Sequence, residues 1–230
     1  MVDVAANYRR VLDRINEAAV RCGRYPGEIK LLAASKSQSV SQIQAAIEAG
    51  IRLFGENYVQ EARDKRNAIE ESVEWHMIGH LQRNKVKVAL ETFSLIQSLD
   101  SLELARELDK QGKRRGEMVR TFVEVNLGGE ESKSGIAKDK VVSLLREVGM
   151  LSYLSVEGLM VVPPFKENPE EVRPYFRALK KLQMEIEDLR IPNVDLKELS
   201  MGMTHDYPVA IEEGATLVRI GTAIFGARRA

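Results

Sequence analysis

Short strand-like runs alternate with helix-like runs along almost the whole chain, and this alternation constrains the fold more than any other feature. The predicted strands cover residues 29–35, 52–55, 74–79, 95–98, 120–127, 155–161, 198–200 and 217–220. The predicted helices between them lie near residues 40–49, 57–71, 84–93, 101–112, 138–148, 170–189 and 205–213. Strands that alternate with helices form a parallel sheet, because each helix returns the chain to the same edge.

Eight strand units within 230 residues favour a closed barrel over an open sheet. An open, doubly wound sheet usually has a glycine-rich turn after its first strand, whereas residues 35–39 read SKSQS. Ahead of the first strand, apolar residues between positions 8 and 19 recur at helical spacing. We therefore predict an α/β fold with one domain over residues 1–230: a (β/α)8 TIM barrel with an extra N-terminal helix.

Charge and cysteine content exclude several classes of partner. The 34 Lys and Arg residues balance 34 Asp and Glu residues, so no net field attracts nucleic acid or an anionic membrane. No apolar run approaches the roughly 20 residues of a membrane span, and charges interrupt the N-terminal run as they would not in a signal peptide. The single cysteine, Cys22, excludes an internal disulfide framework. We expect a cytoplasmic monomer whose ligand is a small molecule.

A lysine directly follows the first predicted strand. Residues 31–36 read LLAASK, which places the ammonium group of Lys36 at the carboxyl end of an apolar run. Active sites of barrels lie at this end of the strands. Lys36 could pair with a carboxylate or reach solvent. Alternatively, desolvation could lower its pKa until the neutral amine attacks an aldehyde. The residue alone leaves both interpretations open.

The last two predicted strands carry features of a phosphate site. Gly221 and Thr222 follow the final strand and precede a short helical turn, where backbone N–H groups are available to an anion. Ser200 and Gly202 come at the end of the preceding strand, and barrel phosphate sites often lie after these two strands. Closure makes the first and last strands neighbours. A ligand with a phosphate and an aldehyde could therefore also reach Lys36.

One arginine and two histidines lie on or beside these strands. Arg219 alternates with Val218 and Ile220, so its side chain faces the other way, toward the barrel interior. There it either pairs with a carboxylate or presents a fixed cation to a ligand. His76 and His80 are not on a helix, so they do not form a helical metal motif, and we predict no metal site. We expect His76 to be a hydrogen-bonded core residue. His80 lies just past the strand end, and the sequence leaves open whether it lines the site.

Six stretches in consistent order carry a resemblance to a known family. They read LLAASKSQ, FGENYVQEA, WHMIGHLQRNK, VNLGGEESKSG, EGLM and LSMGMTHD, the last continuing to AIEEGATLVRIGTAIFGAR. Together they resemble the pyridoxal phosphate homeostasis proteins, single-domain relatives of the N-terminal barrel of alanine racemase. The resemblance extends from about residue 30 to residue 229.

The resemblance implies that the chain binds pyridoxal 5′-phosphate (PLP) and takes part in its intracellular homeostasis, without efficient catalysis of its own. It implies that Lys36 forms an aldimine with PLP, that Arg219 faces the pyridine nitrogen, and that Asn57 lies beside the cofactor. Ser200, Gly221 and Thr222 match phosphate-binding positions, and Lys133 matches a loop lysine near the site. The protein partners that this role implies are PLP-requiring client enzymes.

Two kinds of enzyme remain as alternatives: a PLP-dependent amino-acid racemase or related PLP enzyme, and a Schiff-base aldolase acting on a sugar phosphate. A racemase needs a base on each face of the cofactor. In alanine racemase a tyrosine from a second domain supplies one of them. We expect no such domain here, and we expect Tyr58 and Tyr207 to pack at helix starts. A PLP binder should purify yellow, whereas an aldolase should purify colourless.

Overall fold

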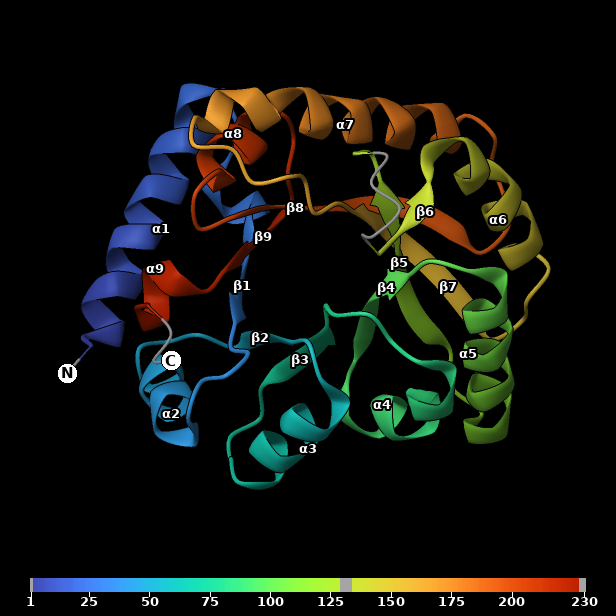
Figure 1. Cartoon of the computed structure of the whole chain (residues 1–230), viewed down its shortest axis with the longest axis horizontal. Coiled ribbons are helices and arrows are strands. Elements are labelled where there is room, and N and C mark those ends of the chain that lie inside the picture. Colours follow the sequence, from blue (N-terminus) through green and yellow to red (C-terminus); the bar gives the residue numbers. More distant parts are fainter. Residues whose placement is uncertain (1, 129–133, 228–230) are drawn as a thin grey trace.

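A computed structural model describes residues 2–128 and 134–227 of the chain. Eight parallel strands close into a barrel, and helices cover its outside (Figure 1). The order around the barrel is β1 to β5, then β7, β8 and β9, and β9 pairs with β1. The predicted TIM barrel with an extra N-terminal helix is confirmed.

The elements follow the predicted alternation closely. The strands are β1 (Lys30–Ala34), β2 (Leu53–Glu56), β3 (Glu74–Met77), β4 (Leu95–Leu99), β5 (Val119–Asn126), β6 (Ile136–Ala137), β7 (Leu154–Met160), β8 (Val194–Met203) and β9 (Leu217–Ile220). The helices are α1 (Val4–Arg21), α2 (Val40–Glu48), α3 (Val59–Asn67), α4 (Val86–Thr92), α5 (Leu102–Arg115), α6 (Val141–Val148), α7 (Arg173–Glu187), α8 (Tyr207–Glu212) and α9 (Thr222–Phe225).

Most strand ends differ from prediction by one or two residues, and two strands differ more. β8 begins at Val194, four residues ahead of the predicted start, because Leu196 and Leu199 are buried while charged residues between them are not. The charges made this segment look like a loop. The two-residue strand β6 was not predicted, and within the described residues it pairs only with the end of β5. It adds to the rim and does not enter the barrel.

Side chains inside the barrel form an apolar layer beneath a polar one. Leu32, Leu95, Phe122 and Leu217 form a separate buried apolar cluster. Three of these strands carry a buried polar residue two positions after the apolar one: Gln97, Glu124 and Arg219 follow Leu95, Phe122 and Leu217. Strand alternation sends both sets of residues inward. The polar layer is therefore closer to the carboxyl ends of the strands.

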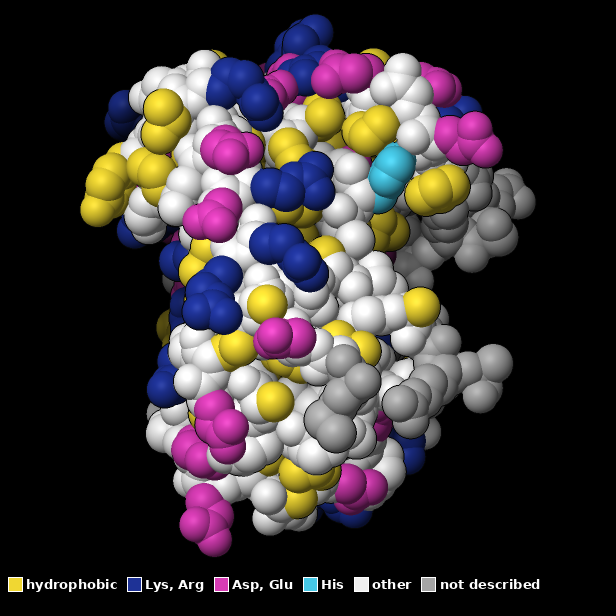
Figure 2. All heavy atoms as spheres, turned by 90° about the vertical axis from the view of Figure 1, so that its left-hand side faces the viewer, with side chains coloured by type: hydrophobic (Ala, Val, Ile, Leu, Met, Phe, Trp, Pro, Cys, Tyr) yellow, Lys and Arg dark blue, Asp and Glu magenta, His cyan; other side chains and the backbone are white. Residues whose placement is uncertain are grey.

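Helix α1 closes the side of the barrel near the chain ends (Figure 1). It packs against α8 and α9, and Asn7 Nδ2 donates to the backbone oxygen of Ile224 in α9 at 2.8 Å. After the helix, Arg24 Nη1 donates to the backbone oxygens of Ile211 and Ala215. Figure 2 shows this face, where side chains of both charge signs lie among hydrophobic ones. None of the described helices is both long and apolar enough to span a membrane.

Candidate functional site

A cavity of about 550 Å³ opens at the carboxyl ends of the barrel strands. Lys36 and Asn57 reach it from the segments after β1 and β2. Arg219 of β9 lines it, as do Gly221 and Thr222 at the start of α9. Its volume lies within the range of small-molecule sites. Five of the seven predicted site residues therefore share one cavity.

The other two predicted residues, Ser200 and Gly202, are buried and do not line the cavity. The Ser200 hydroxyl donates to Gln97 Oε1 at 2.6 Å and accepts from Arg219 Nη1 at 2.6 Å. Gly202 has a φ of +91°, and a Cβ there would lie 2.6 Å from the Cβ of Ala210. Glycine is thus required by the backbone and by α8. A phosphate contact from either residue stays a prediction.

Lys36 lies in a tight turn between β1 and α2. The next residue, Ser37, has a left-handed φ of 63°, which is uncommon for a residue with a side chain. Two residues later Ser39 caps α2: its hydroxyl accepts from Gln42 N–H, and the Gln42 side chain accepts from Ser39 N–H. The sequence immediately after Lys36 therefore fixes where the turn ends and the helix begins.

Arg219 is buried, with 5% of its surface exposed. Its Nη1 donates to Ser200 Oγ at 2.6 Å, and its Nη2 donates to the backbone oxygen of Val161 at 2.8 Å. Burial lowers the pKa of Arg219 to about 10, so the group remains a cation at neutral pH. Within the described part of the chain it forms no ion pair. The alternative prediction, an arginine paired with a carboxylate, is therefore not what this part of the chain shows.

A continuous series of hydrogen bonds runs from Arg219 across the barrel interior, and we call it the arginine relay. Ser200 donates to Gln97 Oε1 at 2.6 Å, and Gln97 Nε2 lies 2.9 Å from His76 Nδ1. His76 Nε2 lies 3.1 Å from Glu74 Oε1. Because the Gln97 amide donates to Nδ1, the histidine proton must be on Nε2, where it donates to Glu74. The prediction of a satisfied core histidine is confirmed.

Glu124 on β5 is a cavity residue that the sequence analysis missed. It is 7% exposed, and burial raises its pKa to about 7, while the positive charge of Arg219 opposes the rise. Phe122, Glu124 and Asn126 share the inward phase of the strand. A carboxylate in the inward phase of an apolar strand is the same signal that singled out Arg219, so this residue could have been found.

The rim of the cavity carries further groups after β3 and β8. His80 lines the cavity, and its Nδ1 lies 3.2 Å from Asp100 Oδ2. Thr204, His205 and Asp206 also line it. They were missed because the predicted strand ended at residue 200, whereas β8 extends to Met203. Lys133 lies outside the described residues.

The chain matches known proteins over nearly its full length. The family model for the N-terminal domain of alanine racemase matches residues 5–229. The pyridoxal phosphate homeostasis protein of Aquifex aeolicus is 46% identical over 221 residues, which cover 96% of each chain. The protein of that name from Escherichia coli K12 is 42% identical over 234 residues, covering 99% of this chain and 98% of its own. This chain belongs to the pyridoxal phosphate homeostasis protein family.

A solved structure of a related protein points to the same family. PipY of Synechococcus elongatus, solved with PLP bound, is 34% identical and superposes with a TM-score of 0.82. The match covers 94% of this chain and 100% of PipY. The family predicted from the six sequence stretches is confirmed. The roles of individual residues toward PLP stay predictions.

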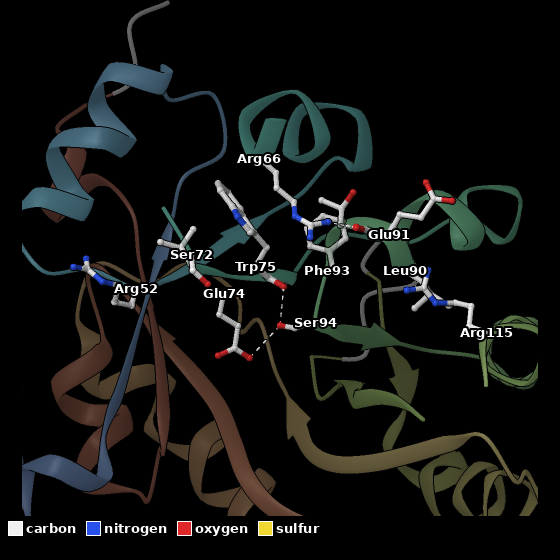
Figure 3. A pocket seen from close by; sticks show the side chains of 12 residues that line it. Arg52, Arg66, Ser72, Glu74, Trp75, Leu90, Glu91, Phe93, Ser94 and Arg115 are labelled. Atoms are coloured by element: carbon white, nitrogen blue, oxygen red, sulfur yellow. Dashed lines mark hydrogen bonds between the residues drawn. The ribbon is translucent and has the colours of Figure 1, made fainter. Parts of the chain in front are cut away.

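This family member has a second hollow, of about 540 Å³, at the opposite end of the barrel (Figure 3). Ser94 Oγ there donates to Glu74 Oε1 at 3.0 Å and to the backbone oxygen of Trp75 at 3.2 Å. Arg52 Nη1 donates to the backbone oxygen of Ile47 at 2.6 Å. These groups already have protein partners, and the amino end of a barrel serves stability. We therefore place the functional site at the carboxyl end.

Proposed function

We propose that this chain holds PLP as a covalent adduct of Lys36 and serves PLP homeostasis in the cell. The observation that carries the proposal is that Lys36, Arg219 and Thr222 line one cavity. The 34% identical PipY was solved with PLP bound. PLP supplies an aldehyde, which condenses with a primary amine and releases water, together with a phosphate group and a pyridine ring.

The start of α9 suits the phosphate end of such a ligand. Thr222 begins the helix and lines the cavity with its hydroxyl, whereas the N–H groups of Ala223 and Ile224 already donate to Thr204 Oγ1 and to the backbone oxygen of Gly221. A Cβ at Gly221 would lie 3.3 Å from the backbone oxygen of Ala34 at the end of β1. The missing side chain lets the two strand ends lie close together. In our proposal this brings the phosphate end within one ligand length of Lys36.

Arg219 is suited to face the pyridine ring of such a ligand. Its guanidinium is held by two hydrogen bonds in the barrel interior, and it remains a cation at neutral pH. A fixed cation disfavours protonation of a neighbouring pyridine nitrogen. An unprotonated ring is a weaker electron sink, which hinders carbanion chemistry. We therefore propose that the chain holds the cofactor without efficient catalysis.

The surroundings of the two candidate tyrosines support the same view. Tyr58 is the residue just before α3 and is mostly exposed, whereas Tyr207 is the buried first residue of α8. No tyrosine among the described residues lines the cavity. Incubation of the PLP-loaded protein with L-alanine, followed by chiral chromatography, should therefore show no efficient formation of D-alanine. Turnover near roughly 1 s⁻¹ that is lost in Lys36→Ala would establish a racemase instead.

The proposed role includes protein partners. We propose that a monomer of this chain passes PLP to PLP-requiring client enzymes. Mixing the loaded protein with a cofactor-free client enzyme should activate the enzyme faster than the rate at which PLP leaves the loaded protein alone. Activation that is limited by that release rate would contradict direct transfer.

Lys36→Ala tests the attachment itself. The purified chain should absorb in the visible region, and borohydride reduction should leave PLP on Lys36 by peptide mass spectrometry. Lys36→Ala should abolish both signals while the circular dichroism spectrum is retained. Lys30→Ala is the matched control, because Lys30 begins β1, the strand that ends just before Lys36, and pairs with Glu198. Full trapping in Lys36→Ala would move the attachment to another lysine, with Lys133 the first to test.

A further inference from the structure

Helix α3 holds the backbone on both sides of Lys36. Lys65 Nζ donates to the backbone oxygen of Ser35 at 2.7 Å, and Glu61 Oε1 accepts from the backbone N–H of Ser37 at 2.6 Å. These atoms belong to the two peptide planes that flank the Lys36 Cα. Because a residue has only two soft backbone dihedrals, fixing both planes fixes the direction in which its side chain leaves the backbone.

Lys65 is the centre of a buried ionic group, which we call the lysine clamp: Glu56, Glu61 and Lys65. Its Nζ lies 2.7 Å from Glu56 Oε1 and 2.6 Å from Glu61 Oε1. Glu56 is fully buried and Lys65 is 6% exposed. The Ser35 hydroxyl donates to the same Glu56 oxygen at 2.6 Å. Burial raises the pKa of Glu56, and the hydrogen bonds from Lys65 and Ser35 oppose that rise.

A buried ionic group of this kind is a poor source of net stability. Removing charges from water costs about as much as their attraction returns, and apolar side chains of similar volume would often serve as well. Glu56 Oε2 is buried without a hydrogen-bond partner among the described residues. Two hydrogen bonds of the clamp go to the backbone of the turn, in which Ser37 has a left-handed φ of 63°. The clamp therefore affects the conformation of the turn that carries Lys36 more than the stability of the whole fold.

We propose that the lysine clamp is a positioning device for Lys36. It holds the turn after β1 in one conformation, so that the amine is already directed at the aldehyde of a bound ligand. The inference rests on the proposed attachment of PLP at Lys36. Neither Glu61 nor Lys65 lines the cavity, so the clamp acts on the rate of attachment and not on the binding of ring and phosphate.

Glu61→Ala is the variant of choice, because Glu61 is partly exposed and its loss leaves the buried Glu56–Lys65 pair intact. Attachment of PLP to the cofactor-free chain is followed by stopped-flow absorbance. Binding of ring and phosphate is measured separately with pyridoxine 5′-phosphate, which has an alcohol in place of the aldehyde. Misplacement of a reacting group by about 1 Å can cost a hundredfold, so we expect attachment to slow by roughly tenfold to a hundredfold.

The controls separate positioning from general structure. Affinity for pyridoxine 5′-phosphate should stay within about threefold of wild type in Glu61→Ala, which is less than one lost hydrogen bond. Glu61→Gln should restore most of the rate, because the amide oxygen can still accept from Ser37 N–H. Glu185→Ala removes an exposed charge paired four residues away on α7, with Lys181, and should match wild type.

Three outcomes would overturn the inference. Glu61→Ala could attach PLP at the wild-type rate, Glu61→Gln could be as slow as Glu61→Ala, or pyridoxine 5′-phosphate affinity could fall in proportion to the rate. The proposed function fails differently, because the wild-type chain itself would then form no adduct at Lys36.

Discussion

The two walls of the cavity hold their functional groups in opposite ways. On the β1 wall, the lysine clamp uses full charges and holds the backbone around Lys36. On the β9 wall, the arginine relay reaches Arg219 through the neutral Gln97 and Ser200 side chains and holds the guanidinium itself. An amine that must form and break a covalent bond needs a fixed backbone position and a side chain that can still move. A cation that only faces a ring needs to stay in place.

The walls also differ in how their charges are compensated. The clamp places two carboxylates against one ammonium group, within 2.7 Å. Among the described residues, Arg219 donates only to neutral acceptors, and burial lowers its pKa to about 10. Because the charges of the β1 wall compensate one another, removing one of them should lower the unfolding free energy strongly. Removing one neutral partner from the β9 wall should lower it less. Five substitutions probe the two walls.

Lys65→Met should have the largest effect. It leaves the buried Glu56 carboxylate without its cation, and breaking a buried ion pair in this way costs about 3–5 kcal/mol of unfolding free energy. Urea denaturation measures the loss. Lys181→Met on the exposed face of α7 is the control and should show no measurable change. A loss no greater than that of the control would show that the clamp does not depend on charge.

Glu124→Gln should stabilise the cofactor-free chain at alkaline pH. The pKa of Glu124 is raised from 4.5 to about 7, so the folded state holds the proton more tightly than the unfolded state. In wild type, the contribution of Glu124 to the unfolding free energy is therefore fully present below pH 4.5 and is lost as the pH rises through 7. At pH 8 the variant should gain up to about 3 kcal/mol, and near pH 4.5 the gain should vanish. Denaturation at both pH values, with exposed Glu117→Gln for comparison, checks this. Parallel pH profiles for wild type and Glu124→Gln would refute it.

Much of the fold was predictable, because strand and helix periodicity are local properties of the sequence. Lys36 and Arg219 were also predictable, the first from its position at a strand end and the second from its inward phase on a strand. Both arguments use only near neighbours in sequence and the direction of parallel strands. Closure of the barrel then brought Lys36 and Thr222 to one cavity, as expected.

The partners of these residues were not predictable in the same way. Ser200 bonds to Gln97, which is 103 residues away, and no local pattern fixes that pairing. Lys65 looks like one more charge on a polar helix, yet it is 6% exposed and bonded to Ser35. Which face of α3 turns toward β1 depends on packing across the whole barrel wall. The sequence therefore located the functional groups but not the groups that hold them.

Thr222→Ala should weaken binding without preventing attachment. In our proposal the hydroxyl donates to the phosphate, and its loss should cost about 1.5–3 kcal/mol, or roughly tenfold to a hundredfold in affinity for PLP. The attachment rate at saturating PLP should not change, in contrast to Glu61→Ala. Unphosphorylated pyridoxal is the control ligand, and its affinity should be the same for wild type and variant. Equal losses for both ligands would move the phosphate away from α9.

Gln97→Met should have the smallest effect on stability. It removes the acceptor of Ser200 and the donor to His76, both of which are uncharged, while Arg219 keeps its bond to Val161. We expect a loss of about 1–2 kcal/mol, less than for Lys65→Met, because a neutral group left without a partner costs less than an ion. Urea denaturation of both variants in the same buffer gives the comparison. Equal losses would show that neutrality gives the β9 wall no advantage.

Gln97→Glu sharpens the comparison by placing a charge within the relay. A carboxylate can still accept from Ser200, but it cannot donate to His76 Nδ1, which would have to carry a proton of its own. We therefore expect the variant to hold a proton on Nδ1, whereas wild-type His76 carries its proton on Nε2. Imidazole nitrogen chemical shifts, measured by NMR on both proteins, distinguish the two arrangements. Identical shifts in wild type and variant would show that His76 and Gln97 are not coupled, and the relay would end at Ser200.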